Sequence, residues 1–121
     1  MLEKLLLLLA PTYVDQDEKV AITAVRSYVQ EQYSKRQWAC IDELWQRESS
    51  WASSRMPWLA ENASSGAYGI VQALPARKMR SHGEDYRTNP ITQVKWGMDY
   101  ITKRYGSPCD ALEFHNKRGW Y

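Results

Sequence analysis

Glu48 is the residue whose position in this sequence best suits a carboxyl group to acid–base chemistry. Ile41, Leu44 and Trp45 follow the spacing of a helical apolar face, and Glu48 occupies the next position on that face. The helix predicted here, about 38–50, also ends close to Glu48, which places the carboxylate at the negative end of the helix dipole. Burial and the dipole both disfavour the charged form, so the pKa of Glu48 is expected to rise toward neutral pH.

Glu48 has a structural interpretation as well. A glutamate at a helix end is often solvated, or it pairs with a cation, for which Arg77 and Lys78 are candidates. Arg47 is adjacent in sequence but points about 100° away around a helix, so its charge need not cancel the shift. An acid with a raised pKa beside a segment rich in Gly and Trp suggests cleavage of a glycosidic bond, in which the acid protonates the leaving oxygen.

Most glycosidases use a second carboxylate about 5 to 9.5 Å from the first. The candidates in this sequence are Asp42, Asp85 and Asp99. Asp42 precedes Glu48 by about 9 Å along the helix axis and lies on a different face, and the sequence does not place the other two. No second acid is therefore identified.

The composition describes one globular domain. The chain has 121 residues, of which 25% are charged and 44% are hydrophobic, and its net charge is +2. This charge is too small and too mixed in sign for a nucleic-acid-binding protein. Six Trp and eight Tyr against one Phe give most aromatic rings a polar group, which suits a half-solvated groove as well as a core.

The N-terminal region is predicted to be a helical extension. Its apolar run, 5–10, is too short to span a membrane and short for a signal peptide, so we expect no stable membrane insertion and no clear signal peptide. Four leucines at helical spacing predict an amphipathic helix that docks on the body: Leu2, Leu5, Leu6 and Leu9. Asp15 and Glu18 form a capping box that begins a second helix, which runs to about Tyr33.

The rest of the chain predicts an α+β fold that is mainly α. Residues 34–37 are interpreted as a polar connection, and Ser65-Gly66 within 51–73 indicates a turn in a short β hairpin or an irregular pair of strands. One helical turn is expected at 75–80 and a loop at 83–88. Asn89-Pro90 begins a helix that Gly106 ends, and a last short helix runs from Ser107-Pro108 to about His115.

The two cysteines, Cys40 and Cys109, permit either two buried thiols or one disulfide. A zinc site would have to recruit His82 and His115 from distant segments, so we expect no metal and no cofactor. If the two thiols are bridged, the protein works outside a reducing cytosol.

Two motifs carry a resemblance to a known family. Arg47-Glu48-Ser49, followed by Ser65-Gly66-Ala67-Tyr68-Gly69-Ile70-Val71-Gln72, resembles the Glu-Ser … Gly-Ala-x-Gly-(Leu/Ile)-x-Gln signature of soluble lytic transglycosylases. These are lysozyme-like enzymes that cut peptidoglycan. The match is closest to the small domain of secreted actinobacterial proteins and of phage tail proteins. Further similar blocks follow in order: Trp38–Asp42, Gln72–Met79, Thr88–Pro90, Trp96–Ile101, Arg104–Cys109 and Gly119–Tyr121.

The resemblance implies a lysozyme-like domain at 38–121 after an extension at 1–37. It implies that Glu48 is the single catalytic acid and base, which protonates the glycosidic oxygen between N-acetylmuramic acid and N-acetylglucosamine and then deprotonates the muramic C6 hydroxyl, closing a 1,6-anhydro ring. It also implies a Cys40–Cys109 disulfide. Six residues are expected to contact the substrate, although Tyr100 suits the core equally: Ser49, Ser65, Tyr68, Gln72, Tyr100 and His115.

The sequence departs from the family pattern in three places, one of which is the third motif, where His115 is retained but the Tyr-Asn of the broader family is absent. The spacing between Glu48 and Gln72 is longer, with extra residues in 53–62 that reshape the groove or add Trp58 as a platform. Phe114 stands where close relatives prefer Trp. Trp45 and Trp96 are expected in the core.

The function expected from these features is a peptidoglycan lytic transglycosylase. The alternatives are a lysozyme-type muramidase that hydrolyses the same bond and a non-catalytic cell-wall-binding module. The expected partner is the glycan strand, with no nucleic acid. We expect a monomer located outside the cytoplasm, either secreted or associated with a phage virion.

Overall fold

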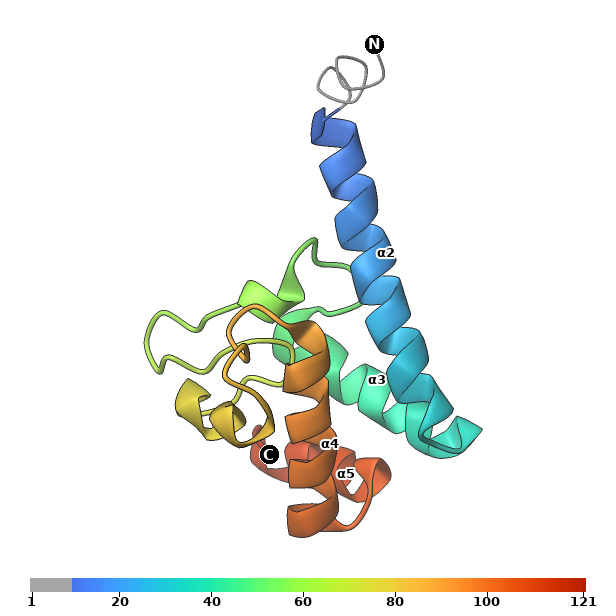
Figure 1. Cartoon of the computed structure of the whole chain (residues 1–121). Helices are drawn as coiled ribbons and strands as arrows, with labels where there is room; N and C mark the ends of the chain where they lie inside the picture. Colours follow the sequence, from blue (N-terminus) through green and yellow to red (C-terminus); the bar gives the residue numbers. More distant parts are fainter. Residues whose placement is uncertain (1–9) are drawn as a thin grey trace.

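The computed structural model describes the backbone of residues 10–121 and the side chains from Ala21 onward. This part of the chain is mainly helical, as predicted (Figure 1). The N-terminal leucine helix predicted within residues 1–10 lies outside the described residues, apart from Ala10. The helices are α2 (Ala10–Glu31), α3 (Lys35–Ser49), α4 (Pro90–Tyr105) and α5 (Pro108–Arg118), with the 3-10 helices η1 (Pro57–Leu59) and η2 (Ala76–His82).

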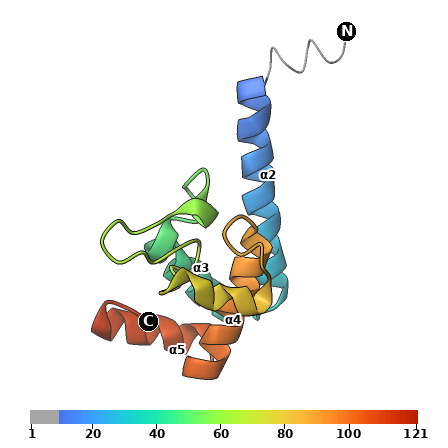
Figure 2. The same ribbon diagram turned by 60° about the vertical axis from the view of Figure 1, so that its left-hand side comes forward.

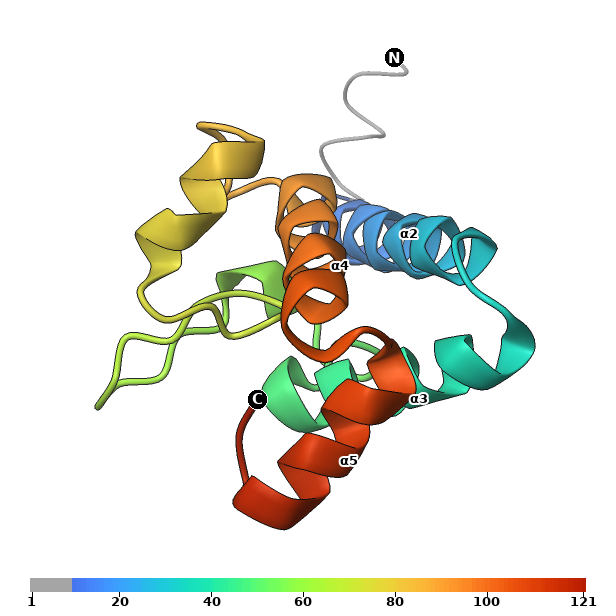
Figure 3. The ribbon, with the colours of Figure 1, turned by 90° about the horizontal axis from the view of Figure 1, so that it is seen from below.

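The helices surround one apolar core. Helices α3 and α5 pack against each other, and α4 contacts α5, α2 and η2 (Figure 3). The C-terminal part of α2 lies against α3 and α4, while its N-terminal part extends away from the body (Figures 1 and 2). No helix in residues 10–121 is long and apolar enough to cross a bilayer. Buried side chains from α2, α3 and α4 meet in the core: Ile22, Val25, Val29, Ile41, Leu44, Trp45, Val94 and Ile101.

The predicted start of α2 was wrong. Asp15 and Glu18 lie inside the helix, which begins at Ala10, so they do not form an N-terminal capping box. Pro11 is compatible with this start, because the first turn of a helix needs no N–H donor from that position. The helix also ends at Glu31, two residues earlier than expected.

Helix α3 begins earlier than predicted, and residues 34–37 are not a connection. Ser34 is the N-cap, and its side chain accepts a hydrogen bond from the backbone N–H of Gln37, which makes these polar residues the first turn. The expected domain boundary at 37 therefore falls within α3. Moreover, Val25 and Val29 of α2 belong to the same apolar core as α3.

The short hairpin predicted in 51–73 is not formed. Only isolated bridges join Glu61 to Tyr68 and Tyr68 to Ala73. The turn at Gly66 is present, with its N–H bonded to Asn62 O, but Gly69 and Gln72 both have positive φ and interrupt the extended backbone on one side. The two bridges correspond to the irregular pairing that was the alternative to a regular hairpin.

Gln93 of α4 organises this irregular segment. Its buried side-chain oxygen accepts a hydrogen bond from Ile70 N–H, and its amide nitrogen donates to the carbonyls of Trp58 and Tyr86. One side chain thus satisfies backbone groups of three separate loops, which buried polar groups require. Trp58 is half-buried against the core.

The caps predicted for α4 and α5 are confirmed. The Asn89 side chain accepts from Ile91 N–H, Gly106 follows the last turn of α4 with positive φ, and the Ser107 side chain caps α5. Helix α5 continues to Arg118, beyond the expected end at His115. A disulfide joins Cys40 of α3 to Cys109 of α5, as the family resemblance implies.

Candidate active site

Glu48 lies in the last turn of α3, with only 18% of its side chain exposed. The helix ends because Ser50 adopts a left-handed conformation and its N–H bonds to Gln46 O. Burial raises the pKa of Glu48 from 4.5 to about 7. The predicted rise is confirmed with burial as its cause, whereas the expected contribution of the helix dipole stays a prediction. The carboxyl group can therefore donate and accept a proton close to neutral pH.

His115 of α5 faces Glu48. Its Nε2 lies 3.1 Å from Oε1 of Glu48, and 15% of the His115 side chain is exposed. Burial, and secondarily the charge of Arg47, lower the pKa of His115. The ring is thus neutral at a pH where Glu48 is still partly protonated, so the two groups do not form a fixed charge pair.

The basic residues near Glu48 do not neutralise it. Arg47 points outward, as its place on the helix predicts, and binds Glu43 at 2.8 Å and the side chain of Asn116. The interpretation in which Glu48 pairs with Arg77 or Lys78 does not match the structure, where the residue facing Glu48 is His115.

Tyr121 connects Glu48 to the neighbouring surface. Its hydroxyl accepts a hydrogen bond from Trp45 Nε1 at 2.9 Å and donates one to the carbonyl of Val71 at 3.0 Å. Burial raises the pKa of Tyr121 well above 10, and the negative charge of Glu48 adds to this shift. The hydroxyl therefore stays neutral and fixes Trp45, one turn before Glu48, against the loop at Val71.

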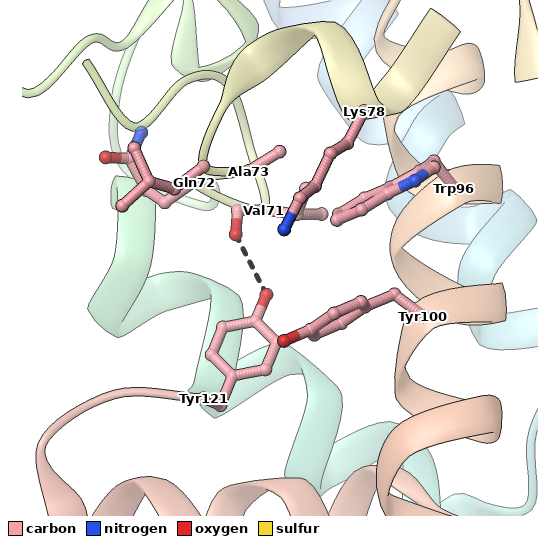
Figure 4. A pocket seen from close by; sticks show the side chains of 8 residues that line it. Val71, Gln72, Ala73, Lys78, Trp96, Tyr100 and Tyr121 are labelled. Atoms are coloured by element: carbon pink, nitrogen blue, oxygen red, sulfur yellow. Dashed lines mark hydrogen bonds between the residues drawn. The ribbon is translucent and has the colours of Figure 1, made fainter. Parts of the chain in front are cut away.

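Tyr121 also lines a pocket between α4 and the segment that follows Ile70 (Figure 4). We call it the aromatic pocket. Its volume is about 70 Å³. Trp96 and Tyr100 of α4 stack with their ring centroids 5.0 Å apart, and Tyr121 meets Tyr100 edge to face. The lining residues are Val71, Gln72, Ala73, Leu74, Lys78, Trp96, Tyr100 and Tyr121.

A second depression of about 270 Å³ continues from the aromatic pocket, with which it shares Trp96 and Tyr100. It runs between η2 and α4. We call the two hollows together the groove, and they combine flat aromatic surfaces with polar edges, which suits an amphipathic ligand such as a saccharide. The groove places Tyr100 at the surface as well as against the core.

The structure brings only some of the predicted contact residues together. Gln72 and Tyr100 line the aromatic pocket, and His115 faces Glu48. Gln72 also donates hydrogen bonds to the carbonyls of Ala60 and Gly69, which orders the loop before it. Ser49 is half-buried and donates to the carbonyl of Trp45.

Ser65 and Tyr68 lie elsewhere. Ser65 is exposed, and its hydroxyl accepts from Ala67 N–H within the turn. Tyr68 is only 7% exposed, and its hydroxyl donates to the carbonyl of Arg87. Tyr68 therefore holds two loops together, and neither residue lines the groove.

The three carboxylates considered as a second acid have other partners. Asp42 binds Arg26 and the indole N–H of Trp51, Asp85 accepts from Asn89 and Thr92, and Asp99 pairs with His82 and Lys103. Their hydrogen bonds lower the pKa of Asp85 and of Asp99, whereas burial raises the pKa of Glu48.

Three residues at this site have roles that sequence patterns did not predict. Trp96 was expected in the core, but only part of its side chain packs against the core, and another part lines the groove. Trp45 is fully buried, as predicted. Tyr121 and Lys78 each lie at or near the end of a sequence block that resembles the family, and this was the one sequence signal that could have pointed to them. Their position at the aromatic pocket depends on how the chain folds. The exposed Trp120 packs on Phe114.

Among the side chains that the structure describes, from Ala21 to Tyr121, no group of His, Cys, Asp and Glu has the arrangement of a metal site. Comparisons with models of protein families, with curated proteins and with solved structures give no match to this chain. The site is therefore interpreted from its own chemistry.

The raised pKa of Glu48 predicts a pH-dependent effect on stability. Ionisation is harder in the folded chain, so the contribution of Glu48 to the free energy of unfolding is lost as pH rises from about 4.5 through about 7. We expect the free energy of unfolding of Glu48→Gln to rise by about 3 kcal/mol relative to that of the wild type as the pH crosses this window. Urea unfolding of both proteins at pH 5 and pH 8 measures it, and a difference that does not change with pH would contradict the burial of this group.

Proposed function

We propose that this protein is a lytic transglycosylase that cleaves the glycosidic bond between N-acetylmuramic acid and N-acetylglucosamine in peptidoglycan. The observation that carries the proposal is Glu48, an acid that is 18% exposed, has a pKa of about 7 and acts electrostatically on Tyr121, which lines the aromatic pocket. The family resemblance of its motif supports the same reaction and a lysozyme-like fold.

A single residue with this pKa suits both steps of the reaction. Glu48, protonated, gives its proton to the glycosidic oxygen, and the bond to the muramic C1 breaks. The resulting carboxylate then takes the proton of the muramic C6 hydroxyl, whose oxygen bonds to C1. The products are a free sugar hydroxyl and a 1,6-anhydro ring, and Glu48 recovers its proton without consuming water.

The neighbours of Glu48 support this exchange of roles. His115, with its lowered pKa, does not hold Glu48 permanently ionised. Tyr121 and Trp45 fix the end of α3 through their hydrogen bond. The glycan strand would lie along the stacked rings of Trp96 and Tyr100, in contact with the Gln72 loop.

Mass spectrometry of digested peptidoglycan tests the proposal. We expect muropeptides that end in anhydromuramic acid, each lighter by one water than the hydrolytic product. Reducing ends in their place would assign the muramidase reaction to the same acid. Binding of glycan strands without any cleavage would assign a cell-wall-binding module and contradict the proposal.

A further inference from the structure

Lys78 is the one charged residue among those that line the aromatic pocket. It is exposed, and its ammonium group points into the pocket, on the side where Tyr100 and Tyr121 lie (Figure 4). In the described part of the chain, no carboxylate is paired with it. The pocket therefore presents an unneutralised cation, which is an arrangement that favours an anionic ligand group.

The neighbouring charges do not reverse this preference. Asp99, the acid of the adjoining depression, already pairs with Lys103 at 3.3 Å and with His82 at 3.1 Å. Arg104 lies at the same depression and packs on the ring of Tyr100. The groove thus has an excess of positive charge where it meets the pocket.

The size of the pocket restricts the group that enters it. A cavity of about 150 Å³ holds a benzene molecule, and the aromatic pocket has about 70 Å³. It accepts a short branch of a sugar rather than a whole ring or a peptide. Muramic acid carries such a branch, the lactyl group at C3. Its carboxyl is free on strands without stem peptides and is an amide on strands that bear them.

We propose that Lys78 binds the free lactyl carboxylate of a muramic residue in the aromatic pocket, so that the protein prefers glycan strands without stem peptides. This inference rests on the function proposed above. It gives Lys78 a role in selecting the substrate, separate from the acid–base chemistry of Glu48.

The test compares three kinds of glycan strand: strands without stem peptides, the same strands with their lactyl carboxylates converted to methyl esters, and strands that retain stem peptides. For the wild type we expect the lowest KM on the free carboxylates, with KM about 10- to 100-fold higher on the esters, since one charge-assisted contact is lost. We expect Lys78→Met to remove this difference while kcat stays within about twofold.

Lys117→Met is the matched control. Lys117 is exposed on α5, where it pairs with Glu113, so the substitution removes the same charge away from the pocket. We expect it to keep the wild-type preference. Near-UV circular dichroism of the Trp side chains verifies that both variants are folded.

The outcomes separate the two proposals. If the wild type cleaves none of the strands, the proposed function fails. If it cleaves them but Lys78→Met still prefers free carboxylates over esters, the inference about Lys78 is wrong. A Lys78-dependent preference for strands with stem peptides would contradict the lactyl assignment, as would a shift in the pH–rate profile of Lys78→Met with an unchanged KM.

Discussion

Replacing Glu48 with glutamine is expected to lower the rate of glycan-strand cleavage by a factor of about 10² to 10⁴, the usual contribution of a positioned general acid. Glutamine keeps the size of the side chain but can neither release a proton to the leaving oxygen nor remove one from the C6 hydroxyl. Strand binding should persist, because the groove at Trp96 and Tyr100 is unchanged. Release of anhydromuramic ends over time measures the effect.

Glu113→Gln is the control for this substitution. Glu113 lies on α5, is 64% exposed and pairs with Lys117, so its loss should leave the cleavage rate within about twofold of the wild type. If Glu48→Gln cleaves glycan strands at the wild-type rate, Glu48 is not the catalytic acid, even if the protein is active on peptidoglycan.

Removing the disulfide is expected to have the largest effect on stability. Cys40 and Cys109 are separated by 69 residues, and opening a loop of that length in the unfolded chain corresponds to about 4 kcal/mol in the chain-entropy description. The double variant Cys40→Ala, Cys109→Ala should unfold at a correspondingly lower denaturant concentration. Equilibrium unfolding in guanidinium chloride measures the change.

Reductant provides the internal control. Dithiothreitol should destabilise the wild type toward the value of the double variant and leave the double variant unaffected. Because the bridge joins the helices that carry Glu48 and His115, residual activity should be lost at a lower temperature in the variant. A difference in unfolding free energy below about 1 kcal/mol would contradict this stabilising role.

Local sequence patterns predicted the parts of the fold that depend on neighbouring residues. The Asn89-Pro90 start and the Gly106 end of α4 follow from backbone rules, and both are confirmed. The face of Ile41, Leu44 and Trp45 is fully buried. Since Glu48 continues that face, its burial and raised pKa could be derived before any contact was known.

The errors arose where a local signal competes with the surrounding chain. Asp15 and Glu18 have the residue types and spacing of a capping box, but α2 begins at Ala10, so both residues lie within the helix. The turn at Gly66 was correct, but the positive φ of Gln72 depends on carbonyls of Ala60 and Gly69 that bind its side chain. The periodicity of apolar residues does not predict such hydrogen bonds.

The groove itself could not be predicted, because its walls come from distant segments. Trp96 and Tyr100 share a helix face, but Tyr121 reaches them only after α5 packs on α3. The partner of Glu48, His115, likewise depends on that packing. Contacts of this kind depend on the tertiary structure, and the spacing of residues in one sequence does not predict them.

Gln93 has a consequence for the motions of this protein. Its amide joins Trp58, Ile70 and Tyr86, which belong to loops with little regular hydrogen bonding of their own. These loops therefore open together rather than one by one, as a single cooperative unit anchored on α4. We therefore expect amide-hydrogen exchange in one of them to report on all three, and the Ile70 loop continues into Val71 and Gln72 at the aromatic pocket.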